Sequence, residues 1–391
     1  MPFIQKPVIK IITGMRRVGK STLMQMMENH LLEQGVSSSQ ILFISKESLE
    51  FDFIQNYQDL YQYVKTQTAG LKGTVYLFID EIQEIEHWEK AVTAFLADEV
   101  ADIYISGSNA HLLSSEMATL ISGRYVEIPV YPLTFKEFLD FRKSGESSHR
   151  IEEEFSNYLK YGGLPGIHAL EFREEVIFQY LNSIFNTILL KDVVSRNRIR
   201  DVGQLENIAR YVFDNCGNIL AAKRISDYLK SQRIKVSMDT VQNYLNHLRM
   251  AFLIFKAMRF DLKGKRHLEV LEKYYMGDIG LRHAFLGYKD RDISGLLENV
   301  VYLELLFRGY QVSVGKLNGT EIDFIAEKQN EKIYIQVCYL LASSETVERE
   351  FRPLEQIDDN FPKLVLSMDK DWGEGRKGIM RKSVIDFLLG G

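Results

Sequence analysis

The sequence predicts an α/β protein whose first third is a parallel β-sheet with helices on both faces. Short runs rich in β-branched and aromatic residues alternate with longer helical segments, and this alternation is typical of parallel sheets. A glycine-rich turn follows the first run, as expected where a strand leads into a helix. The expected strands are residues 7–13, 40–45, 75–79, 103–106 and 125–130, and the expected helices between them are residues 21–33, 56–68 and 88–97. Because the alternation stops near Pro132, we expect the first domain to span residues 1–133.

The composition is that of a globular protein with several domains. The chain has 391 residues, more than one ordinary hydrophobic core holds, and 46% of them are hydrophobic. The net charge of −5 gives no overall attraction to nucleic acid, so such a partner would need a local basic surface. Cys216 and Cys338 lie far apart and form no metal-ligand pattern, which favours a reducing cytoplasm. Neither a signal peptide nor a membrane span is expected.

Three further domains are expected after residue 133. Residues 134–200 have a helical pattern, with a polar insertion at Lys143–Ser148 and a turn at Tyr161–Gly166. Residues 201–287 predict three amphipathic helices and a hairpin, and residues 288–391 predict a helix followed by a meander of strands. We therefore expect a helical lid, a three-helix domain and a second α/β domain in that order.

A glycine-rich loop between the first strand and the first helix predicts a phosphate site. Its sequence, Gly14-Met-Arg-Arg-Val-Gly-Lys-Ser, fits the pattern G-x-x-x-x-G-K-[ST] in the strand–loop–helix setting that this pattern requires. Glycines allow backbone N–H groups to point at phosphate oxygens, Lys20 adds a cation, and the Ser21 hydroxyl can bind Mg²⁺. The residues expected to contact the nucleotide are Gly14, Arg16, Arg17, Val18, Gly19, Lys20, Ser21 and Thr22. The alternative, a chance match in a glycine turn, is disfavoured by this setting.

Two acidic residues end the third strand, Val75-Tyr-Leu-Phe-Ile-Asp-Glu. Asp80 is expected to hold Mg²⁺ together with Ser21, and Glu81 to orient and polarise an attacking water. A solvated strand end is the plain alternative, but the upstream phosphate loop favours ATP hydrolysis. Ser108 or Asn109, at the tip of the next strand, is expected to reach the γ-phosphate or the water, because ligands of open α/β sheets bind at the carboxyl ends of strands.

Arg124 precedes the fifth strand and is the candidate for action between subunits. A guanidinium at a subunit edge can stabilise transition-state charge in a neighbouring copy. A surface ion pair is an equally good interpretation. The sequence therefore leaves a catalytic homo-oligomer and a solvated arginine as alternatives.

Four segments together resemble a large prokaryotic family of AAA-type P-loop ATPases. These segments are Gly14–Thr22, Leu77–Gln83, Gly107–Asn109 and Tyr131-Pro-Leu-Thr-Phe-Lys-Glu-Phe. The resemblance extends over nearly the whole chain and implies ATP as ligand and Mg²⁺ as cofactor. It also implies the phosphate-binding lysine at Lys20 and the catalytic acids at Asp80 and Glu81. The C-terminal domain of this family has no known function.

The three helices and hairpin of residues 201–287 predict a winged helix-turn-helix domain, which AAA-type ATPases often carry. In the third helix Val241, Leu245 and Leu248 share the core face. Residues that can read base edges fall outside this face, namely Gln242, Asn243, Asn246 and Arg249. Phosphate contacts would come from the basic hairpin tip, Lys263, Lys265 and Arg266. DNA binding, packing on the ATPase domain and assembly are the open alternatives.

The last domain resembles the restriction-endonuclease-like fold. That fold places an acid on one strand, followed on the next strand by an acid or glutamine two residues before a lysine. Asp323 matches the first acid, Glu298 a helical acid and Gln336 the glutamine. Cys338 stands where the lysine should be, and a thiol cannot place an ammonium beside the nucleophile. We therefore expect a retained fold with a lost reaction, against the alternative of active cleavage.

The combined interpretation is an ATPase that switches contacts between its domains and a partner. The first alternative is a DNA-binding regulatory module gated by ATP, and the second is an ATP-dependent nuclease. A basic face would favour the first alternative, and a metal at Asp323 the second.

Overall fold

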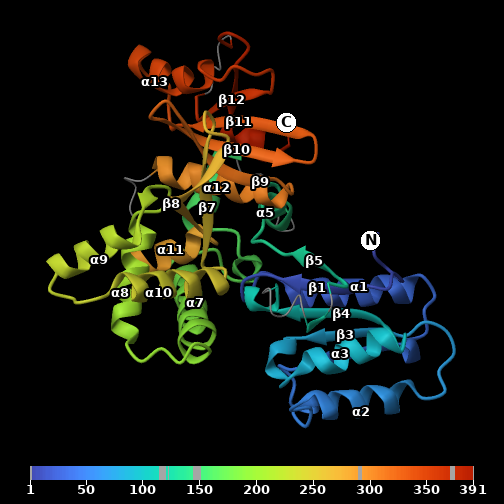
Figure 1. Ribbon diagram of the computed structural model, residues 1–391. Coiled ribbons are helices and arrows are strands. Elements are labelled where there is room, and N and C mark those ends of the chain that lie inside the picture. Colours follow the sequence, from blue (N-terminus) through green and yellow to red (C-terminus); the bar gives the residue numbers. More distant parts are fainter. Residues whose placement is uncertain are drawn as a thin grey trace. The chain divides into compact units, whose positions relative to one another are not determined.

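The computed structural model of the chain describes residues 2–113, 120–121, 123–143, 151–288, 293–369 and 375–390. The chain forms two compact units, the first made of residues 1–130 and 250–252 and the second of residues 131–249 and 253–391 (Figure 1). The first unit thus ends where the alternation of strands and helices stops in the sequence. Of the polar insertion expected at Lys143–Ser148, only Lys143 belongs to the described residues.

The first unit contains a five-stranded sheet with the order β2-β3-β4-β1-β5. Its strands are β1 (Ile9–Thr13), β2 (Ile41–Ser45), β3 (Tyr76–Asp80), β4 (Asp102–Gly107) and β5 (Tyr125–Pro129). Its α-helices are α1 (Lys20–Glu33), α2 (Tyr57–Thr68) and α3 (Trp88–Ala97). Neighbouring strands all run parallel, so the carboxyl ends of β1, β3 and β4 meet at one edge. The predicted parallel sheet is confirmed.

Helices cover both faces of this sheet because alternate strand residues point to opposite sides. On one face α1 packs against Ile12, Phe78 and Tyr104. On the other face α2 and α3 pack against residues such as Ile11 and Ile79 (Figure 1). The central strands are therefore buried on both sides, which accounts for their nearly continuous apolar sequences.

The second unit begins with a helical segment. Its helices are α5 (Phe135–Lys143), α6 (Ile151–Tyr161), α7 (Glu174–Thr187) and a π-helical stretch (Ile188–Ser195). Asp278, at the N-terminus of α11 (Ile279–Leu286), ties the turn after α6 to α11. Its Oδ2 accepts a hydrogen bond from the N–H of Gly163 at 2.7 Å, and its Oδ1 accepts one from the N–H of Leu281 at 3.0 Å. A Cβ at Gly280 would lie 2.0 Å from the carbonyl oxygen of Tyr161, so glycine is needed where α11 meets this turn.

Three helices and a hairpin follow, as the sequence predicts. The elements are α8 (Val202–Asp214), β6 (Ile219–Leu220), α9 (Ala222–Ser231), α10 (Met238–Met250), β7 (Ile254–Asp261) and β8 (Arg266–Met276). Strand β8 pairs antiparallel with both β7 and β6. Ser237 begins α10, because its hydroxyl oxygen accepts a hydrogen bond from the N–H of Thr240 at 3.1 Å.

The remaining strands continue the sheet that the hairpin begins. The C-terminal elements are α12 (Ile293–Phe307), β9 (Gln311–Leu317), β10 (Thr320–Lys328), β11 (Glu331–Val337), α13 (Ser344–Glu355), β12 (Lys363–Ser367), β13 (Met380–Ser383) and α14 (Val384–Leu388). One eight-stranded sheet results, with the order β13-β12-β11-β10-β9-β7-β8-β6, in which β7 and β9 run parallel. Strands from both sides of the boundary expected after residue 287 therefore belong to one sheet. The winged-helix and nuclease-like assignments stay predictions. Among the described helices, none combines the length and apolar character needed to cross a bilayer.

Candidate active site

The predicted glycine-rich loop joins β1 to α1 at the carboxyl edge of the first sheet. A Cβ at Gly14 would lie 2.2 Å from the carbonyl oxygen of Val130, so a side chain here would collide with the residue that follows β5. Gly19 precedes α1 with a φ of 102°, in the region that favours glycine. No described side chain caps the first turn of α1. Its backbone N–H groups and the helix dipole are therefore suited to bind a phosphate.

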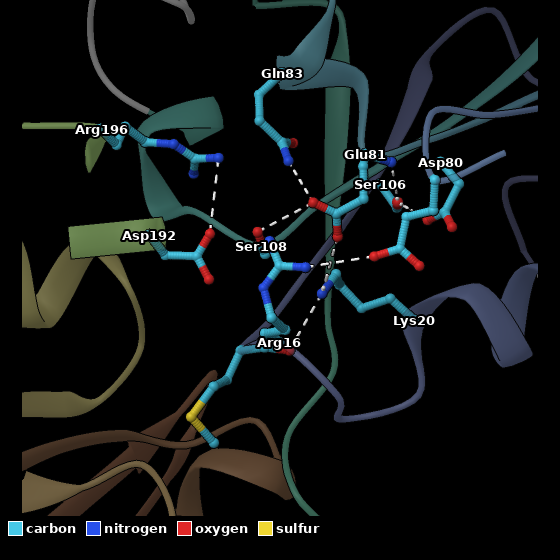
Figure 2. Close-up of polar contacts among 11 residues, drawn as sticks. Arg16, Lys20, Asp80, Glu81, Gln83, Ser106, Ser108, Asp192 and Arg196 are labelled. Atoms are coloured by element: carbon cyan, nitrogen blue, oxygen red, sulfur yellow. Dashed lines mark hydrogen bonds and ion pairs between the residues drawn. The ribbon is translucent and has the colours of Figure 1, made fainter. Parts of the chain in front are cut away.

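Lys20 is the first residue of α1 and is buried, with 4% of its surface exposed. Its Nζ donates to the carbonyl oxygen of Met15 at 3.1 Å, which folds the side chain back over its own loop. The same atom lies 3.7 Å from Oε1 of Glu81, as Figure 2 shows. The lysine of the loop and the second acid of β3 are thus brought together.

The other predicted loop residues differ in exposure. Arg16 is buried, and its Nη1 lies 3.4 Å from Oε1 of Glu47. Val18 is buried as well, whereas Arg17 and Thr22 are exposed. Ser21 is half-buried. The loop therefore combines buried and exposed predicted residues.

Glu81 is held in place by several donors. It adopts a left-handed backbone conformation with a φ of 55° directly after β3. Its Oε2 accepts hydrogen bonds from the Ser108 hydroxyl at 3.1 Å and from the Gln83 side-chain amide (Figure 2). Burial by itself would raise the pKa of Glu81, but the cations Lys20 and Arg16 and these two hydrogen bonds hold it below its usual value. The carboxylate is therefore ionised near neutral pH.

Asp80 is joined to the neighbouring strand through Ser106. The Ser106 hydroxyl donates to Oδ1 of Asp80, and its oxygen accepts the N–H of Glu81 at 3.1 Å. Because β3 and β4 are parallel neighbours, these residues meet at the same sheet edge as the loop. A carboxylate and the Ser21 hydroxyl are oxygen ligands of the kind that Mg²⁺ prefers, so the residues present fit this cation.

The remaining predicted site residues differ in whether they contact the cluster formed by Lys20, Asp80 and Glu81. Ser108 and Asn109 are buried, and Ser108 contacts Glu81 directly. Arg124 is exposed, and its carbonyl oxygen accepts the N–H of Ile9 at 3.0 Å. No hydrogen bond or ion pair between described residues joins the Arg124 side chain to the cluster. Its neighbour Ser122 lies outside the described residues.

Sequence reasoning missed two residues that position the acids, Gln83 and Ser106. A Cβ at Gly107 would lie 2.2 Å from Cδ1 of Leu112 and 2.5 Å from Oε1 of Gln83, so a larger residue there would force these side chains to shift. Ser106 is a polar residue directly after the run Ile103–Ile105 of β4, a strand that also begins with the polar Asp102. This polar residue at the end of an apolar run was the sequence signal for Ser106. For Gln83 the sequence offered no signal apart from its closeness to Glu81.

The polar face predicted for the third helix of residues 201–287 is exposed on α10. Val241, Leu245 and Leu248 are buried, as expected. The candidate readers of base edges are all exposed, namely Gln242, Asn243, Asn246 and Arg249. The basic residues of the β7–β8 turn are exposed too, namely Lys263, Lys265 and Arg266. A cavity of about 310 Å³ beside α10 is lined in part by Gln242, Arg249 and Lys256.

Of the residues that match the nuclease pattern, Gln336 is bonded both to Asp323 and to Glu350. The Gln336 carbonyl oxygen accepts the N–H of Asp323 at 2.7 Å, and its amide donates to Oε2 of Glu350 at 3.1 Å. Cys338 lies in a hydrophobic core, and burial raises the pKa of its thiol to about 12. Cys216 and Cys338 are both buried, and neither forms a disulfide. Within the described residues no group of three His, Cys, Asp or Glu side chains is arranged to hold a metal ion.

Comparisons with known proteins agree with this geometry. Residues 6–139 match a family described as an AAA domain, and residues 152–292 match a domain of unknown function, DUF8612. An uncharacterized protein of Haemophilus influenzae is 40% identical over 382 residues, which cover 97% of this chain and 94% of that protein. The uncharacterized protein MJ1544 of Methanocaldococcus jannaschii is 31% identical over 363 residues, which cover 89% of this chain and 78% of that protein.

A solved structure shares the fold. The Walker-type ATPase PABY2304 of Pyrococcus abyssi superposes with a TM-score of 0.50 at 14% identity, over 71% of this chain and 91% of that chain. At this identity the likeness shows the fold alone. The identity to the two relatives over most of their lengths shows more, because it places the chain in one family with the Haemophilus protein and MJ1544, and residues 6–139 of this chain match the AAA domain.

Proposed function

We propose that the protein binds ATP with Mg²⁺, hydrolyses it, and uses the cycle to switch contacts with a partner. The observation that carries this proposal is the meeting of Lys20, Asp80 and Glu81 at one sheet edge, beside a loop whose geometry suits phosphate. The match of residues 6–139 to an AAA domain supports the same chemistry.

Each residue of the site has a role in this proposal. Residues 14–22 bind the phosphates mainly through backbone N–H groups, and Lys20 balances the charge of the β- and γ-phosphates. Ser21 and Asp80 hold Mg²⁺, which when bound stabilises the charge on the phosphate oxygens. Glu81 orients the attacking water and accepts its proton, and Ser108 or Asn109 contacts the γ-phosphate or this water.

The Lys20–Glu81 contact links nucleotide binding to the ability of Glu81 to accept a proton. A phosphate group that binds Lys20 competes with Glu81 for the same ammonium, which lies 3.7 Å from that carboxylate. When Lys20 turns to the phosphate, Glu81 keeps its hydrogen bonds from Ser108 and Gln83. The carboxylate then has one cation fewer beside it and becomes a better proton acceptor.

Replacement of Glu81 tests the proposal. Glu81→Gln should keep Mg²⁺-dependent ATP binding but slow hydrolysis by about 10²- to 10⁴-fold, because the amide cannot accept the proton. The exposed Glu86 provides a matched control, and Glu86→Gln should hydrolyse ATP at the wild-type rate. Wild-type turnover in Glu81→Gln would remove Glu81 from the mechanism.

Arg124 stays a candidate for action on a neighbouring subunit in a homo-oligomer. It is exposed at the start of β5, which leaves its guanidinium accessible to a second copy. An arginine placed in this way can stabilise charge on the transferred phosphoryl group.

A second candidate function is DNA binding through residues 201–287, with ATP as the gate. The exposed polar face of α10 and the exposed basic β7–β8 turn favour it. The order helix–strand–helix–helix–hairpin, with β6 paired to β8, supports a winged helix-turn-helix.

Fluorescence anisotropy with labelled duplex DNA at several salt concentrations tests this function. Joint replacement of Lys263, Lys265 and Arg266 by alanine should weaken binding and flatten its dependence on salt, because fewer counterions are released. A control should remove as many charges from the first unit, at Lys6, Lys65 and Lys72. An unchanged salt slope would place any DNA contact elsewhere.

We further propose that the C-terminal segment is nuclease-like but does not cleave nucleic acid. The engagement of Gln336 with Glu350 and the burial of Cys338 support this proposal. Supercoiled and single-stranded DNA should stay intact with Mg²⁺ or Mn²⁺ and ATP. Cleavage that disappears in Asp323→Ala would contradict it.

A further inference from the structure

The cavity beside α10 is bordered by elements from three places in the sequence. Its volume is about 310 Å³, and its lining comes from the β6–α9 junction, from α10 and from the β7–β8 hairpin. The lining residues of α10 are numbers 242, 245, 246 and 249, a spacing that places them on one face of the helix. Leu220, Leu245 and Leu271 give the cavity an apolar part. A cavity of this size with a partly apolar lining suits a small organic molecule.

The acid that lines this cavity, Glu272, is already bonded on both of its oxygens. Its Oε1 accepts a hydrogen bond from Nζ of Lys256 at 2.8 Å, and its Oε2 accepts one from the Tyr274 hydroxyl at 2.8 Å. Lys256 and Glu272 therefore form an ion pair within the lining, and their charges cancel. The carboxylate of Glu272 thus gives the cavity no unpaired negative charge.

Arg249 is a cation of the lining that pairs with no acid among the described residues. Its Nη2 donates a hydrogen bond to Oδ1 of Asn246 at 2.9 Å, and the guanidinium makes no ion pair within the described part of the chain. A guanidinium has five N–H donors, so most of them stay available to a ligand. The charge of Arg249 also acts on the hairpin side of the cavity. Burial and the hydrogen bond to Glu272 raise the pKa of Tyr274, and Arg249 opposes this rise.

Two side-chain amides add further donors beside Arg249. The Gln242 amide makes no hydrogen bond to any described residue, and the amide of Asn246 serves there only as an acceptor. Each amide carries two N–H donors. Gln242, Asn246 and Arg249 are all exposed, so a molecule can reach them from solvent. The cavity therefore presents N–H donors and an unpaired positive charge next to an apolar part.

The charges of the lining favour a ligand with one negative charge. Arg249 and Lys256 are cations and Glu272 is an anion, which leaves one net positive charge. A carboxylate carries one negative charge, and its two oxygens match the planar fork of arginine. A phosphate monoester carries about −1.5 to −2 at neutral pH, more than this lining balances. We propose that the cavity binds a small organic monocarboxylate, with the carboxylate on Arg249 and the apolar part of the ligand against the three leucines. This inference depends neither on ATP hydrolysis nor on DNA binding.

Fluorine NMR of three small probes tests the proposal on the full chain without nucleotide or DNA. 4-Fluorobenzoate carries the carboxylate, 4-fluorobenzamide is its neutral counterpart of nearly the same shape, and 4-fluorophenyl phosphate carries the larger charge. Line broadening on titration with protein gives the three affinities. The benzoate should bind about tenfold more tightly than the benzamide, because only the carboxylate forms charge-assisted hydrogen bonds with the guanidinium. It should also bind more tightly than the phosphate.

Variants of the lining show whether the benzoate occupies this cavity. Arg249→Gln should weaken benzoate binding by about tenfold and leave benzamide binding unchanged. Arg249→Lys keeps the charge without the planar fork and should retain only part of the affinity. Ala222→Phe, at a lining position, should block the cavity without changing its charge. The control is Arg352→Gln, at an exposed arginine of α13 outside the lining, which should bind the benzoate normally.

Four results would overturn the proposal. One is an absence of 4-fluorobenzoate binding at millimolar concentration, and another is equal affinity for the benzoate and the benzamide. Tighter binding of the phosphate probe would assign the cavity to phosphate groups, those of DNA included. Undiminished benzoate binding in folded Arg249→Gln or folded Ala222→Phe would place the ligand elsewhere. Circular dichroism establishes that each variant is folded, and the Arg249 and Ala222 variants test the site independently of one another.

Discussion

Nζ of Lys20 lies 3.7 Å from Oε1 of Glu81, so the proposed phosphate-binding cation and the proposed acceptor of the water proton are partners of one another. The contact joins the first residue of α1 to the residue that follows β3, which is 61 positions further along the chain. It ties the charge of each group to the presence of the other. Substitution of either residue should therefore change the electrostatic environment of the other.

Lys20→Ala should weaken Mg²⁺-dependent ATP binding by about 100-fold, which corresponds to about 2.7 kcal/mol. The reason is that the phosphates lose their only lysine from the loop, while backbone donors remain. Binding is measured by calorimetry with a slowly hydrolysed ATP analogue. Lys72→Ala, at an exposed position of the same unit, serves as the control and should bind normally. Undiminished affinity in a folded Lys20→Ala protein would refute the site.

Gln83→Ala should lower kcat by about tenfold with little change in KM, because the carboxylate of Glu81 loses one of the donors that orient it. The same loss should raise the pKa of Glu81, since Gln83 is one of the groups that lower it. The acidic limb of the kcat/KM profile should then shift to higher pH. Gln58→Ala, at an exposed position on α2, is the control. An unmoved acidic limb would assign Gln83 a purely structural role.

Arg124→Ala should be inactive alone if the arginine acts on a neighbouring subunit. Mixing it with inactive Lys20→Ala should then restore part of the activity, because a mixed assembly contains sites with both residues intact. The measurement is the ATPase rate of mixtures at constant total protein. Full activity of Arg124→Ala by itself would end the idea.

Asp278 should make the second unit less stable as pH rises from about 4 to 6. Burial raises the pKa of this carboxyl from 3.8 to about 6, although the backbone N–H groups of Gly163, Leu281 and Gly280 oppose the rise. The folded chain therefore binds a proton that the unfolded chain releases in this range. The resulting stabilisation, about 3 kcal/mol, is complete below pH 3.8 and is lost as pH passes 6.

Hydrogen exchange detects this effect locally. Peptides covering residues 160–166 and 278–282 should lose protection as pH rises, after correction for intrinsic exchange. Asp278→Asn should be less protected overall, since its amide nitrogen faces an N–H group, but its protection should not vary with pH in this range. The exposed Asp239→Asn should retain the wild-type profile. Equal pH profiles for wild type and Asp278→Asn would contradict the prediction.

Local patterns predicted the first sheet and its phosphate loop well. The strand expected at residues 75–79 is observed at Tyr76–Asp80, and the helix expected at residues 88–97 is observed at Trp88–Ala97. These elements can be predicted because the periodicity of a strand or helix depends only on residues that are close together in the sequence. The glycine pattern likewise predicts the loop from neighbouring residues, although the close approach of Gly14 to Val130 follows only from the fold.

Contacts between distant segments could not be predicted in the same way. The parallel pairing of β7 with β9 joins strands on opposite sides of residue 287, and no turn sets its register. Lys273 of β8 meets Glu298 of α12 and Asp323 of β10 through tertiary contacts, so the residues near Lys273 in the sequence do not predict these partners. The roles of Gln83 and Ser106 depend on side-chain directions at a strand end, which residue spacing alone leaves open.

The two outermost strands of the eight-stranded sheet are short. At one end β6 contributes only Ile219 and Leu220, and at the other β13 contributes Met380–Ser383 before the chain turns into α14. A long, flat outer strand would offer rows of N–H and C=O groups to another chain and so invite aggregation. Because the outer strands are short, they expose few unpaired N–H and C=O groups with which a strand of another chain could pair. The sheet can therefore stay limited to its own strands during synthesis, when many copies of the chain are close together.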